Sequence, residues 1–427
     1  MRRSWWTALA VLTAFPATAQ AQIVPLPSVP QTLGTVGRQL GEVLPDADLL
    51  PEAQRIARTL TRDRLERLRE IVRRNPDTIA LDRDGNPVRA REIVVVDPDA
   101  ELIERARGQG FALIEQAQVE GLDVGFARFE TPTGESLQRA LKRMRALAGK
   151  REVSTDPLHF ASGAALGEAP TPALVRAAPA PGALRIGIID GGIDAGAFSN
   201  PIVQRGFAAG APAVNGHAMA VASLAAGSPA IRGAAPGASL LVADVYGRDP
   251  AGGNATAIAR AIGWMVEQRV PVVTISLVGP PNPLLARIVA AARARGTVIV
   301  AAVGNDGPAA PPAYPASYPQ AVSVTGVDAR GRALIEAGRA RHLDYAAPGA
   351  DMLAAAPGGR TVAVRGTSFA APLVAGRLAR AYPALDPAGI AAGLRALDRD
   401  ALDLGKRGPD PLYGRGLVCG DCRTPKK

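Results

Sequence analysis

Apolar side chains follow different periods in different parts of the chain, and these periods predict three kinds of region. In residues 51–74 apolar positions recur at helical spacing, which predicts one amphipathic helix or two. Residues 91–159 mix short β-branched or alternating runs with two helical segments. From residue 183 onward, strongly apolar runs alternate with helical segments. The pattern therefore predicts a helical region, a small mixed module and a larger α/β domain.

The small module is predicted from the order of its elements. Strands are expected at residues 93–96, 112–116, 124–129 and 153–156, and helices at 100–107 and 136–147. This order, strand-helix-strand-strand-helix-strand, is that of the split βαβ or ferredoxin-like α+β module, and we assign it to residues 91–160. The turn sequence Asp84-Gly85-Asn86-Pro87 is expected to separate the module from the preceding helical region.

The larger domain is predicted to have a doubly wound, mostly parallel sheet flanked by helices. Strands are expected at residues 184–189, 239–245, 272–277, 297–303 and 321–327, with helices at 217–226, 255–268, 283–295 and 368–382. Continuous apolar strands between helices are typical of parallel sheets covered on both faces. We assign this domain to residues 183–418 and expect its reactive groups outside the carboxyl ends of the strands.

The N-terminus has the features of an export signal. Arg2 and Arg3 precede an apolar run at residues 5–14 and the small-x-small sequence Ala19-Gln20-Ala21. We therefore expect a signal peptide at residues 1–21 and a periplasmic or secreted protein. The apolar run is shorter than the ~20 residues that span a bilayer, so no stable membrane span is expected. Residues 22–90 should form a flexible arm and then the helical region, and the Ala- and Pro-rich residues 161–182 a linker.

The distribution of charge along the chain argues against a nucleic-acid partner. The formal net charge is +10, but the arginines are scattered, and in residues 51–74 they alternate with Glu66 and Glu70. Neither zinc-finger spacing nor an aromatic RNA-binding motif accompanies them, so a solvated helix face explains them and no nucleic-acid partner is expected.

Two cysteines, Cys419 and Cys422, lie in the C-terminal tail at residues 419–427. In an exported protein they predict a local disulfide that fixes the tail. A redox CxxC would be expected at a helix N-terminus after a strand, and a zinc site would need two further ligands. Neither alternative is supported.

Two candidate catalytic side chains come from the first half of the larger domain. Asp190 directly follows a predicted buried strand in Ile-Ile-Asp-Gly-Gly, although Asp194 offers an alternative carboxylate, and dinucleotide- or metal-binding proteins also place an Asp there. His217 precedes a run of small residues that predicts a closely packed helix. The other histidines, His159 and His342, are interpreted as structural.

Two further candidates come from the second half. Asn305 follows a predicted strand in Ala-Val-Gly-Asn, where it could simply occupy a turn. Ser368 begins a predicted helix in Gly-Thr-Ser-Phe-Ala-Ala-Pro, where a serine could simply be an N-cap. The same position would also place its hydroxyl beside backbone N–H groups, which suits an attacking oxygen whose product is an oxyanion.

Taken together, these four contexts, in the order Asp, His, Asn, Ser, resemble the subtilisin-like serine peptidases over residues 184–418. The resemblance implies a catalytic triad of Asp190, His217 and Ser368, with Asn305 as an oxyanion donor. It also implies polypeptide substrates, which would bind along two segments. These comprise Ser276, Leu277, Val278, Gly279, Ala301, Ala302, Val303 and Gly304.

The resemblance further implies that residues 91–160 act as an intramolecular inhibitor and folding assistant of a zymogen; an ordinary accessory domain is the alternative. Self-processing is then expected between His159 and Leu184. We expect no cofactor; calcium is known in the family, but the chain has no run of acidic ligands, and only 27 residues separate Asp190 from His217.

One departure from the family pattern leaves an alternative open. Ala218 and Met219 stand where the family usually has Gly and Thr after the histidine. A catalytically weak or inactive pseudoprotease that binds peptides in the same cleft is therefore the second hypothesis. A non-protease α/β enzyme that uses an Asp is the third, and it leaves residues 366–372 unexplained.

Overall fold

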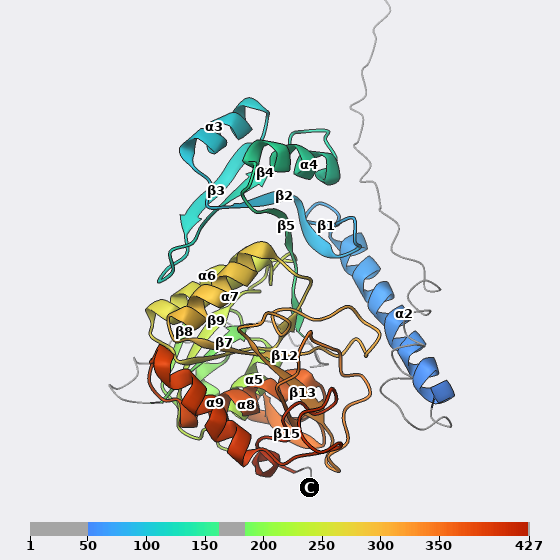
Figure 1. The fold of residues 1–427 in the computed structure, drawn as a ribbon, viewed down its shortest axis with the longest axis vertical. Helices are drawn as coiled ribbons and strands as arrows, with labels where there is room; N and C mark the ends of the chain where they lie inside the picture. Colours follow the sequence, from blue (N-terminus) through green and yellow to red (C-terminus); the bar gives the residue numbers. More distant parts are fainter. Residues whose placement is uncertain (1–49, 162–183, 426–427) are drawn as a thin grey trace, which may run out of the picture.

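The computed structural model describes residues 50–161 and 184–425 (Figure 1). The predicted signal peptide, the arm before residue 50 and nearly all of the predicted linker lie outside these residues. Within the described part of the chain, no helix is both long and apolar enough to cross a membrane.

A seven-stranded sheet forms the centre of the larger domain. Its order is β14-β13-β12-β10-β7-β9-β8, and all neighbours are parallel. This confirms the predicted doubly wound α/β fold, but the two edge strands β8 and β14 were not expected because their apolar runs are short. The strands are β7 (Arg185–Asp190), β8 (Ile202–Gly206), β9 (Ser239–Asp244), β10 (Val272–Ile275), β12 (Val298–Ala302), β13 (Val322–Val327) and β14 (Tyr345–Pro348).

Helices cover both faces of this sheet. The helices α5 (Gly216–Ala226) and α8 (Ala371–Ala381) pack on one face, and α6 (Ala255–Glu267) and α7 (Pro283–Ala294) on the other. Helix α5 consists largely of small residues and is buried almost all round. Helix α9 (Ile390–Asp400), which packs beside α8, was not predicted.

Short elements complete the larger domain, and most of them lie in loops where no period is visible in the sequence. The hairpin is β15 (Met352–Ala356) with β16 (Arg360–Val364). The one-turn helices are η2 (Ala195–Ala197), η3 (Pro357–Gly359), η4 (Thr367–Phe369), η5 (Pro387–Gly389) and η6 (Gly420–Cys422).

The small module has the predicted strand and helix order. Its antiparallel sheet consists of β1 (Ile79–Leu81), β2 (Pro87–Val96), β4 (Gly125–Glu130), β3 (Ala112–Gln118) and β5 (Val153–Pro157). The helices α3 (Ala100–Gly108) and α4 (Leu137–Ala148) cover one face, where Ile93 and Val95 are buried. Val94 and Val96 point to the other face and belong to the core shared with α6 and α7. The module therefore sits on the larger domain through its sheet (Figure 1).

The start of the module differs from the prediction. Residues 84–86 lie in the connection between β1 and β2, and Pro87 is the first residue of β2, opposite Leu81. They therefore form a hairpin turn inside the module, and residue 91 falls within strand β2. The Asp-Gly-Asn-Pro sequence is compatible with either location, because it predicts a turn without saying what the turn connects.

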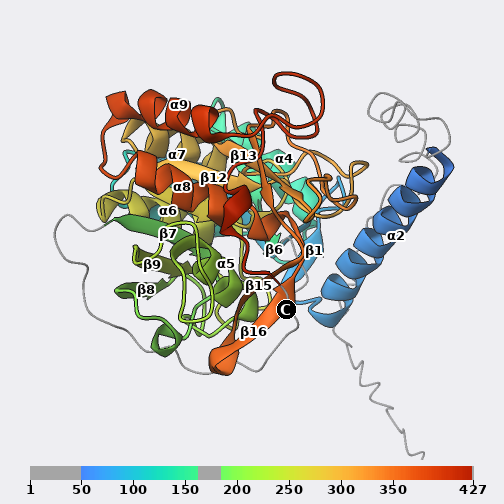
Figure 2. The ribbon, with the colours of Figure 1, turned by 90° about the horizontal axis from the view of Figure 1, so that it is seen from below.

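Two segments connect the module with the larger domain. Helix α2 (Leu50–Arg74) precedes the module and runs along the side of the molecule (Figures 1 and 2). After the module, the short strand β6 (Phe160–Ala161) pairs antiparallel with β11 (Leu277–Val278). The chain thus crosses from the module onto the larger domain at the segment expected to bind substrate.

The C-terminal tail is fixed by the predicted disulfide. Cys419 and Cys422 are bonded to each other, and both are buried. Leu353 donates its backbone N–H to Thr424 O, so the tail also pairs with β15.

Candidate active site

Asp190 is the last residue of β7 and is buried, with 1% of its surface exposed. The backbone N–H of Gly191 donates to its Oδ1 at 2.8 Å, and its Oδ2 lies 2.8 Å from Nδ1 of His217. The alternative carboxylate, Asp194, instead accepts a hydrogen bond from the backbone of Gly196 at the start of η2. The structure therefore selects Asp190 as the partner of the imidazole.

His217 lies in the first turn of α5 and is also buried. Asn215 caps this helix by accepting from the backbone N–H groups of His217 and Ala218. An ionised carboxylate can only accept, so the contact with Asp190 places the imidazole proton on Nδ1 and leaves Nε2 as the basic nitrogen. Nε2 is buried and has no hydrogen-bond partner among the described residues.

Ser368 lies in η4, one turn before α8, rather than in α8 itself. The predicted helix at 368–382 therefore starts late, because Gly366 (φ 143°) redirects the backbone and Pro372 occupies the first turn of α8. The Ser368 hydroxyl donates to Ser276 O at 3.2 Å, and the Ser276 hydroxyl donates to Ser368 O at 2.8 Å. The ring centroid of the next residue, Phe369, lies 5.4 Å from that of His217, so the serine and histidine segments are neighbours.

Asn305 is held in place by the residue before Ser368. Its Oδ1 accepts from the backbone N–H of Thr367 at 2.9 Å. The Thr367 hydroxyl accepts from Gly304 N at 3.0 Å and donates to Gly304 O at 3.1 Å. These contacts couple the loop after β12 to the serine loop, which explains why threonine stands before the serine. They also fix the plane of the Asn305 amide.

The two segments expected to bind substrate lie in different surroundings. Leu277 and Val278 pair with β6, and Val278 and Gly279 line a cavity of about 960 Å³. In contrast, Ala301 and Ala302 are buried inside β12, and Val303 is also buried. Gly304 has a φ of +88° and lies against Val278, so this segment approaches the cleft at its last residue.

The residues that replace the usual Gly-Thr after the histidine fit the core. Ala218 and Met219 are both fully buried. The Met219 sulfur accepts a hydrogen bond from the backbone N–H of Asp194 at 3.2 Å. Met219 thus supports the loop that follows Asp190.

Sequence analysis missed the role of residues 158–161, which we call the tail strand. The backbone N–H of His159 donates to Gly253 O at 2.8 Å, while Phe160 and Ala161 pair with Val278 and Leu277 on the other side. The tail strand thus lies between two segments of the larger domain, as an added β-strand does in peptide recognition. A short apolar run between the module and the predicted linker was the available signal.

The His159 imidazole is buried in a tight pocket. A Cβ atom on Gly279 would lie 2.6 Å from its Cδ2, so glycine is required there. Neither ring nitrogen has a hydrogen-bond partner among the described residues. Burial disfavours the imidazolium and lowers the pKa of His159 to about 4.

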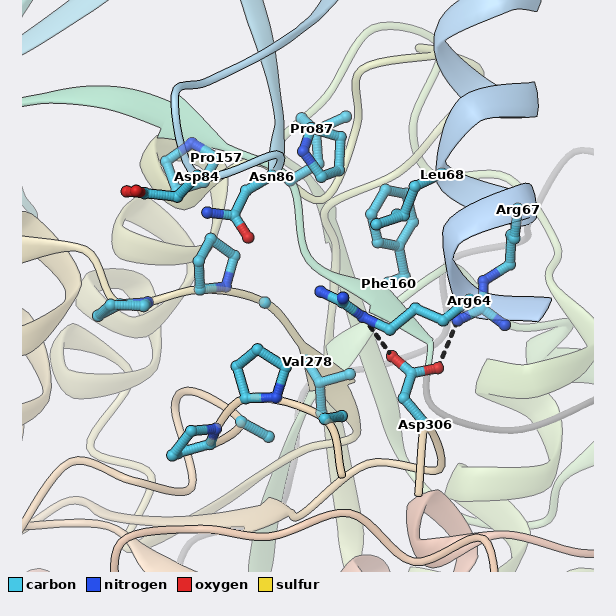
Figure 3. A pocket seen from close by; sticks show the side chains of 18 of the residues that line it. Arg64, Arg67, Leu68, Asp84, Asn86, Pro87, Pro157, Phe160, Val278 and Asp306 are labelled. Carbon is cyan, nitrogen blue, oxygen red and sulfur yellow. Dashed lines mark hydrogen bonds and ion pairs between the residues drawn. The ribbon is translucent and has the colours of Figure 1, made fainter. Parts of the chain in front are cut away.

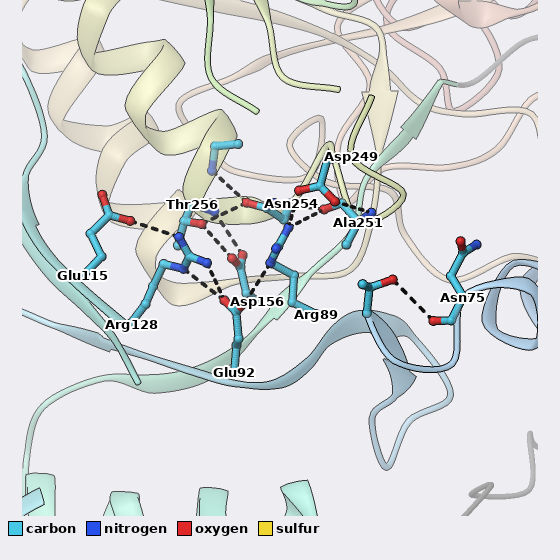
Figure 4. Close-up of polar contacts among 12 residues, drawn as sticks. Asn75, Arg89, Glu92, Glu115, Arg128, Asp156, Asp249, Ala251, Asn254 and Thr256 are labelled. Atoms are coloured by element: carbon cyan, nitrogen blue, oxygen red, sulfur yellow. Dashed lines mark hydrogen bonds and ion pairs between the residues drawn. The ribbon is translucent and has the colours of Figure 1, made fainter. Parts of the chain in front are cut away.

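Asp156 anchors the chain just before the tail strand (Figure 4). It is fully buried and accepts from both the backbone N–H and the hydroxyl of Thr256, at 3.0 and 2.6 Å, in the first turn of α6. Burial raises its pKa to about 6, although the Thr256 hydrogen bonds and the nearby Arg128 act in the opposite direction. The carboxyl thus binds where the N–H groups of a helix end need acceptors.

Potential metal ligands cluster at one place in the described part of the chain, at Cys419, Asp421 and Cys422. Both sulfur atoms are in the disulfide, so they cannot act as thiolate ligands. The expectation that the protein uses no cofactor stays a prediction.

Comparison with known proteins identifies the family. The subtilase family model matches residues 185–416. Subtilisin BL from Lederbergia lenta is 30% identical over 249 residues, which cover 56% of this chain and 90% of that protein. The major intracellular serine protease of Bacillus subtilis is 36% identical over 150 residues, and the match covers 34% of this chain and 47% of that protein.

Solved structures agree on the fold. Fervidolysin from Fervidobacterium pennivorans superposes with a TM-score of 0.64 at 20% identity, covering 80% of this chain and 61% of that chain. The epidermin leader peptide processing serine protease of Staphylococcus aureus superposes with a TM-score of 0.59 at 15% identity, covering 78% of this chain and 97% of that chain.

The fold and the paired Asp190 and His217 define a subtilisin-like hydrolase. The chain belongs to the subtilase family of serine endopeptidases.

Proposed function

We propose that this protein hydrolyses peptide bonds with Asp190, His217 and Ser368 as its catalytic triad. The observation that carries the proposal is the buried contact of 2.8 Å between Asp190 Oδ2 and His217 Nδ1, on an imidazole whose ring lies beside Phe369, the residue after Ser368. Few other roles explain a desolvated imidazole that is bound to a carboxylate on one side and has no partner on the other.

In the proposed reaction the Ser368 hydroxyl turns from Ser276 O toward His217 Nε2. Its oxygen attacks the scissile carbonyl carbon while Nε2 takes the proton, and Asp190 stabilises the imidazolium. Nε2 then donates that proton to the leaving amine as the C–N bond breaks. Water then attacks the acyl carbonyl carbon while Nε2 takes its proton. Nε2 donates that proton to the Ser368 oxygen as the ester bond breaks, which restores the serine.

The negative charge on the tetrahedral intermediate needs donors already in place. Asn305 is suited to this role because its Oδ1 is fixed on Thr367 N, so its Nδ2 is carried on an amide of defined orientation. The backbone N–H of Ser368 is the second proposed donor.

We further propose that the protein is exported and made as a zymogen, with the module at residues 91–160 as its inhibitor. The position of the tail strand against Leu277 and Val278 supports the inhibitory role, because the tail strand takes the place that a substrate would need. The module also contributes Val94 and Val96 to a core shared with α6 and α7. Self-processing is expected in the segment between His159 and Leu184, directly after the tail strand.

A fluorophosphonate probe tests the proposed activity, because it labels a serine that a neighbouring base has activated. The purified wild-type protein should be labelled on Ser368, whereas Ser368→Ala should not be labelled. Equal labelling of both proteins, or none of either after the module has been removed, would leave the peptide-binding pseudoprotease as the better account.

A further inference from the structure

Helix α2 has an apolar face that is buried although the helix belongs to neither domain core. Ala57, Thr61, Leu65 and Leu68 are buried at helical spacing, whereas Arg62 and Arg69 are exposed. A helix that buries one face has a partner surface. The question is which parts of the molecule that surface includes.

One partner is the loop that carries Asn305. Arg64 and Arg67 both pair with Asp306, the next residue, with N–O distances of 3.2 and 2.5 Å (Figure 3). Gly307 then lies so close to the helix that a Cβ atom on it would be 2.9 Å from Leu60 Cδ1. Gly307 also has a φ of +84°, so glycine is favoured there on two grounds. Helix α2 thus contacts the loop directly after the proposed oxyanion donor.

The other partner is the tail strand. Near the end of α2, Ile71 and Val72 pack in a small apolar cluster with Leu158 and Phe160. Leu68 and Phe160 also line the cavity of about 960 Å³, together with Val278, which is the strand partner of Phe160 (Figure 3). One rigid helix therefore connects the loop at Asn305 with the strand that occupies the cleft.

We propose that α2 is a strap that keeps the tail strand in the cleft and so delays activation after the chain has been cut. This rests on the proposed function. The module and the tail strand form the first inhibitory contact, and α2 adds a second one that is anchored on Asp306. Cleavage after the tail strand, between Ala161 and Leu184, leaves α2, the module and the tail strand on one fragment, which must separate before a substrate can bind.

The anchor is electrostatic and half-exposed, so its strength should be moderate. The side chains of Arg64 and Asp306 are 23% and 26% exposed, and that of Arg67 is 54% exposed. Such pairs are weakened by salt, because the screening length falls from about 10 Å at 0.1 M to about 3 Å at 1 M salt. Salt should therefore hasten activation of the wild-type precursor.

The test compares Arg64→Glu/Arg67→Glu with the matched control Arg62→Glu/Arg69→Glu in the full-length precursor. Both double variants make the same change of charge on α2, but only the first reverses the contact with Asp306. Activity against a chromogenic peptide is followed from the moment of cleavage. We expect the lag before full activity to shorten by about three- to tenfold in the first variant and to stay near the wild-type value in the control. Equal lags in all three proteins would overturn the proposal.

A second readout separates failure of the strap from failure of the proposed function. In the Ser368→Ala precursor, which should remain uncut, hydrogen exchange is measured in residues 158–161 and 304–307. Arg64→Glu/Arg67→Glu should speed exchange in both segments relative to the control pair. Unchanged exchange contradicts the strap even if the protein is an active protease. Faster exchange supports it even if peptide hydrolysis is never detected.

Discussion

The molecule buries two aspartate and histidine sets, and they differ in a way that separates catalysis from inhibition. In the larger domain Asp190 and His217 bind each other. At the end of the module, Asp156 in β5 binds Thr256 instead, and the His159 ring in the tail strand has no hydrogen-bond partner among the described residues. Asp190 and His217 form a hydrogen-bonded pair that is held by strand β7 and helix α5. The second set consists of two separately buried groups on a segment that has to leave.

The consequences of burial follow from this difference. Burial lowers the pKa of His159 to about 4, and burial raises the pKa of Asp156 to about 6. Both groups therefore resist charging while the tail strand is bound. Release into water would return both groups toward their ordinary values. Tail binding should therefore depend on pH, through two groups with opposite signs.

The same substitution at the two aspartates sharpens the comparison and gives the largest expected effect. Asp190→Asn should reduce kcat by about 10⁴-fold, because an amide no longer holds the imidazole in the required tautomer. Asp156→Asn should leave kcat of the processed enzyme unchanged, since its fragment has departed. Steady-state hydrolysis of a peptide by proteins processed in trans measures both. A small effect at residue 190 would break the distinction.

The next effect concerns tail binding at acid pH. A free histidine gains a proton near pH 6.5, whereas bound His159 stays neutral until about pH 4. Its contribution to binding is thus complete above pH 6.5 and falls as the pH drops toward 4, by up to about tenfold per pH unit. His159→Phe should remove this loss. Exchange of the residue 159 amide, corrected for intrinsic rates and measured in the Ser368→Ala precursor, provides the check.

Asp156 should act in the opposite direction. Its bound pKa of about 6 exceeds the ordinary 3.8, so its contribution is complete below pH 3.8 and is lost as the pH rises through 6. Asp156→Asn mimics the neutral acid and should make the tail bind more tightly at pH 7 than in the parent. If exchange at residue 159 becomes faster at pH 7 in this variant, the assigned sign is wrong.

The smallest effect is expected far from both sets. Cys419 and Cys422 close a loop with a sequence separation of 3, so replacing both with serine should cost about 1–2 kcal/mol of unfolding free energy. Urea unfolding of the Ser368→Ala precursor avoids self-digestion, and adding a reductant to the parent should reproduce the shift. A large loss of catalysis in the processed double variant would show that the tail supports the site.

Much of this organisation could be predicted from the sequence, and the misses have physical causes. Strands such as β7 and β12 are continuous apolar runs, and the serine segment has a specific sequence, so the sheet and the four candidate positions were accessible. Strands β8 and β14 lie at the edges and have short apolar runs. Helix α2 was predicted, but its contact with Asp306 was not, because a pairing between residues 64 and 306 leaves no local pattern. The tail strand was missed because its short apolar run does not indicate which distant segments it pairs with, namely residues 253 and 277–278.

The central claim is that Asp190, His217 and Ser368 act as one unit. The most direct test is whether the fold-reductions in hydrolysis rate caused by single substitutions multiply in a double variant. Peptide hydrolysis is measured for Ser368→Ala, His217→Ala and the double variant, each processed in trans and freed of its N-terminal fragment. If the histidine acts through the serine, the double variant should be no slower than Ser368→Ala alone. If the two single losses instead multiply in the double variant, the residues act independently and the account is contradicted.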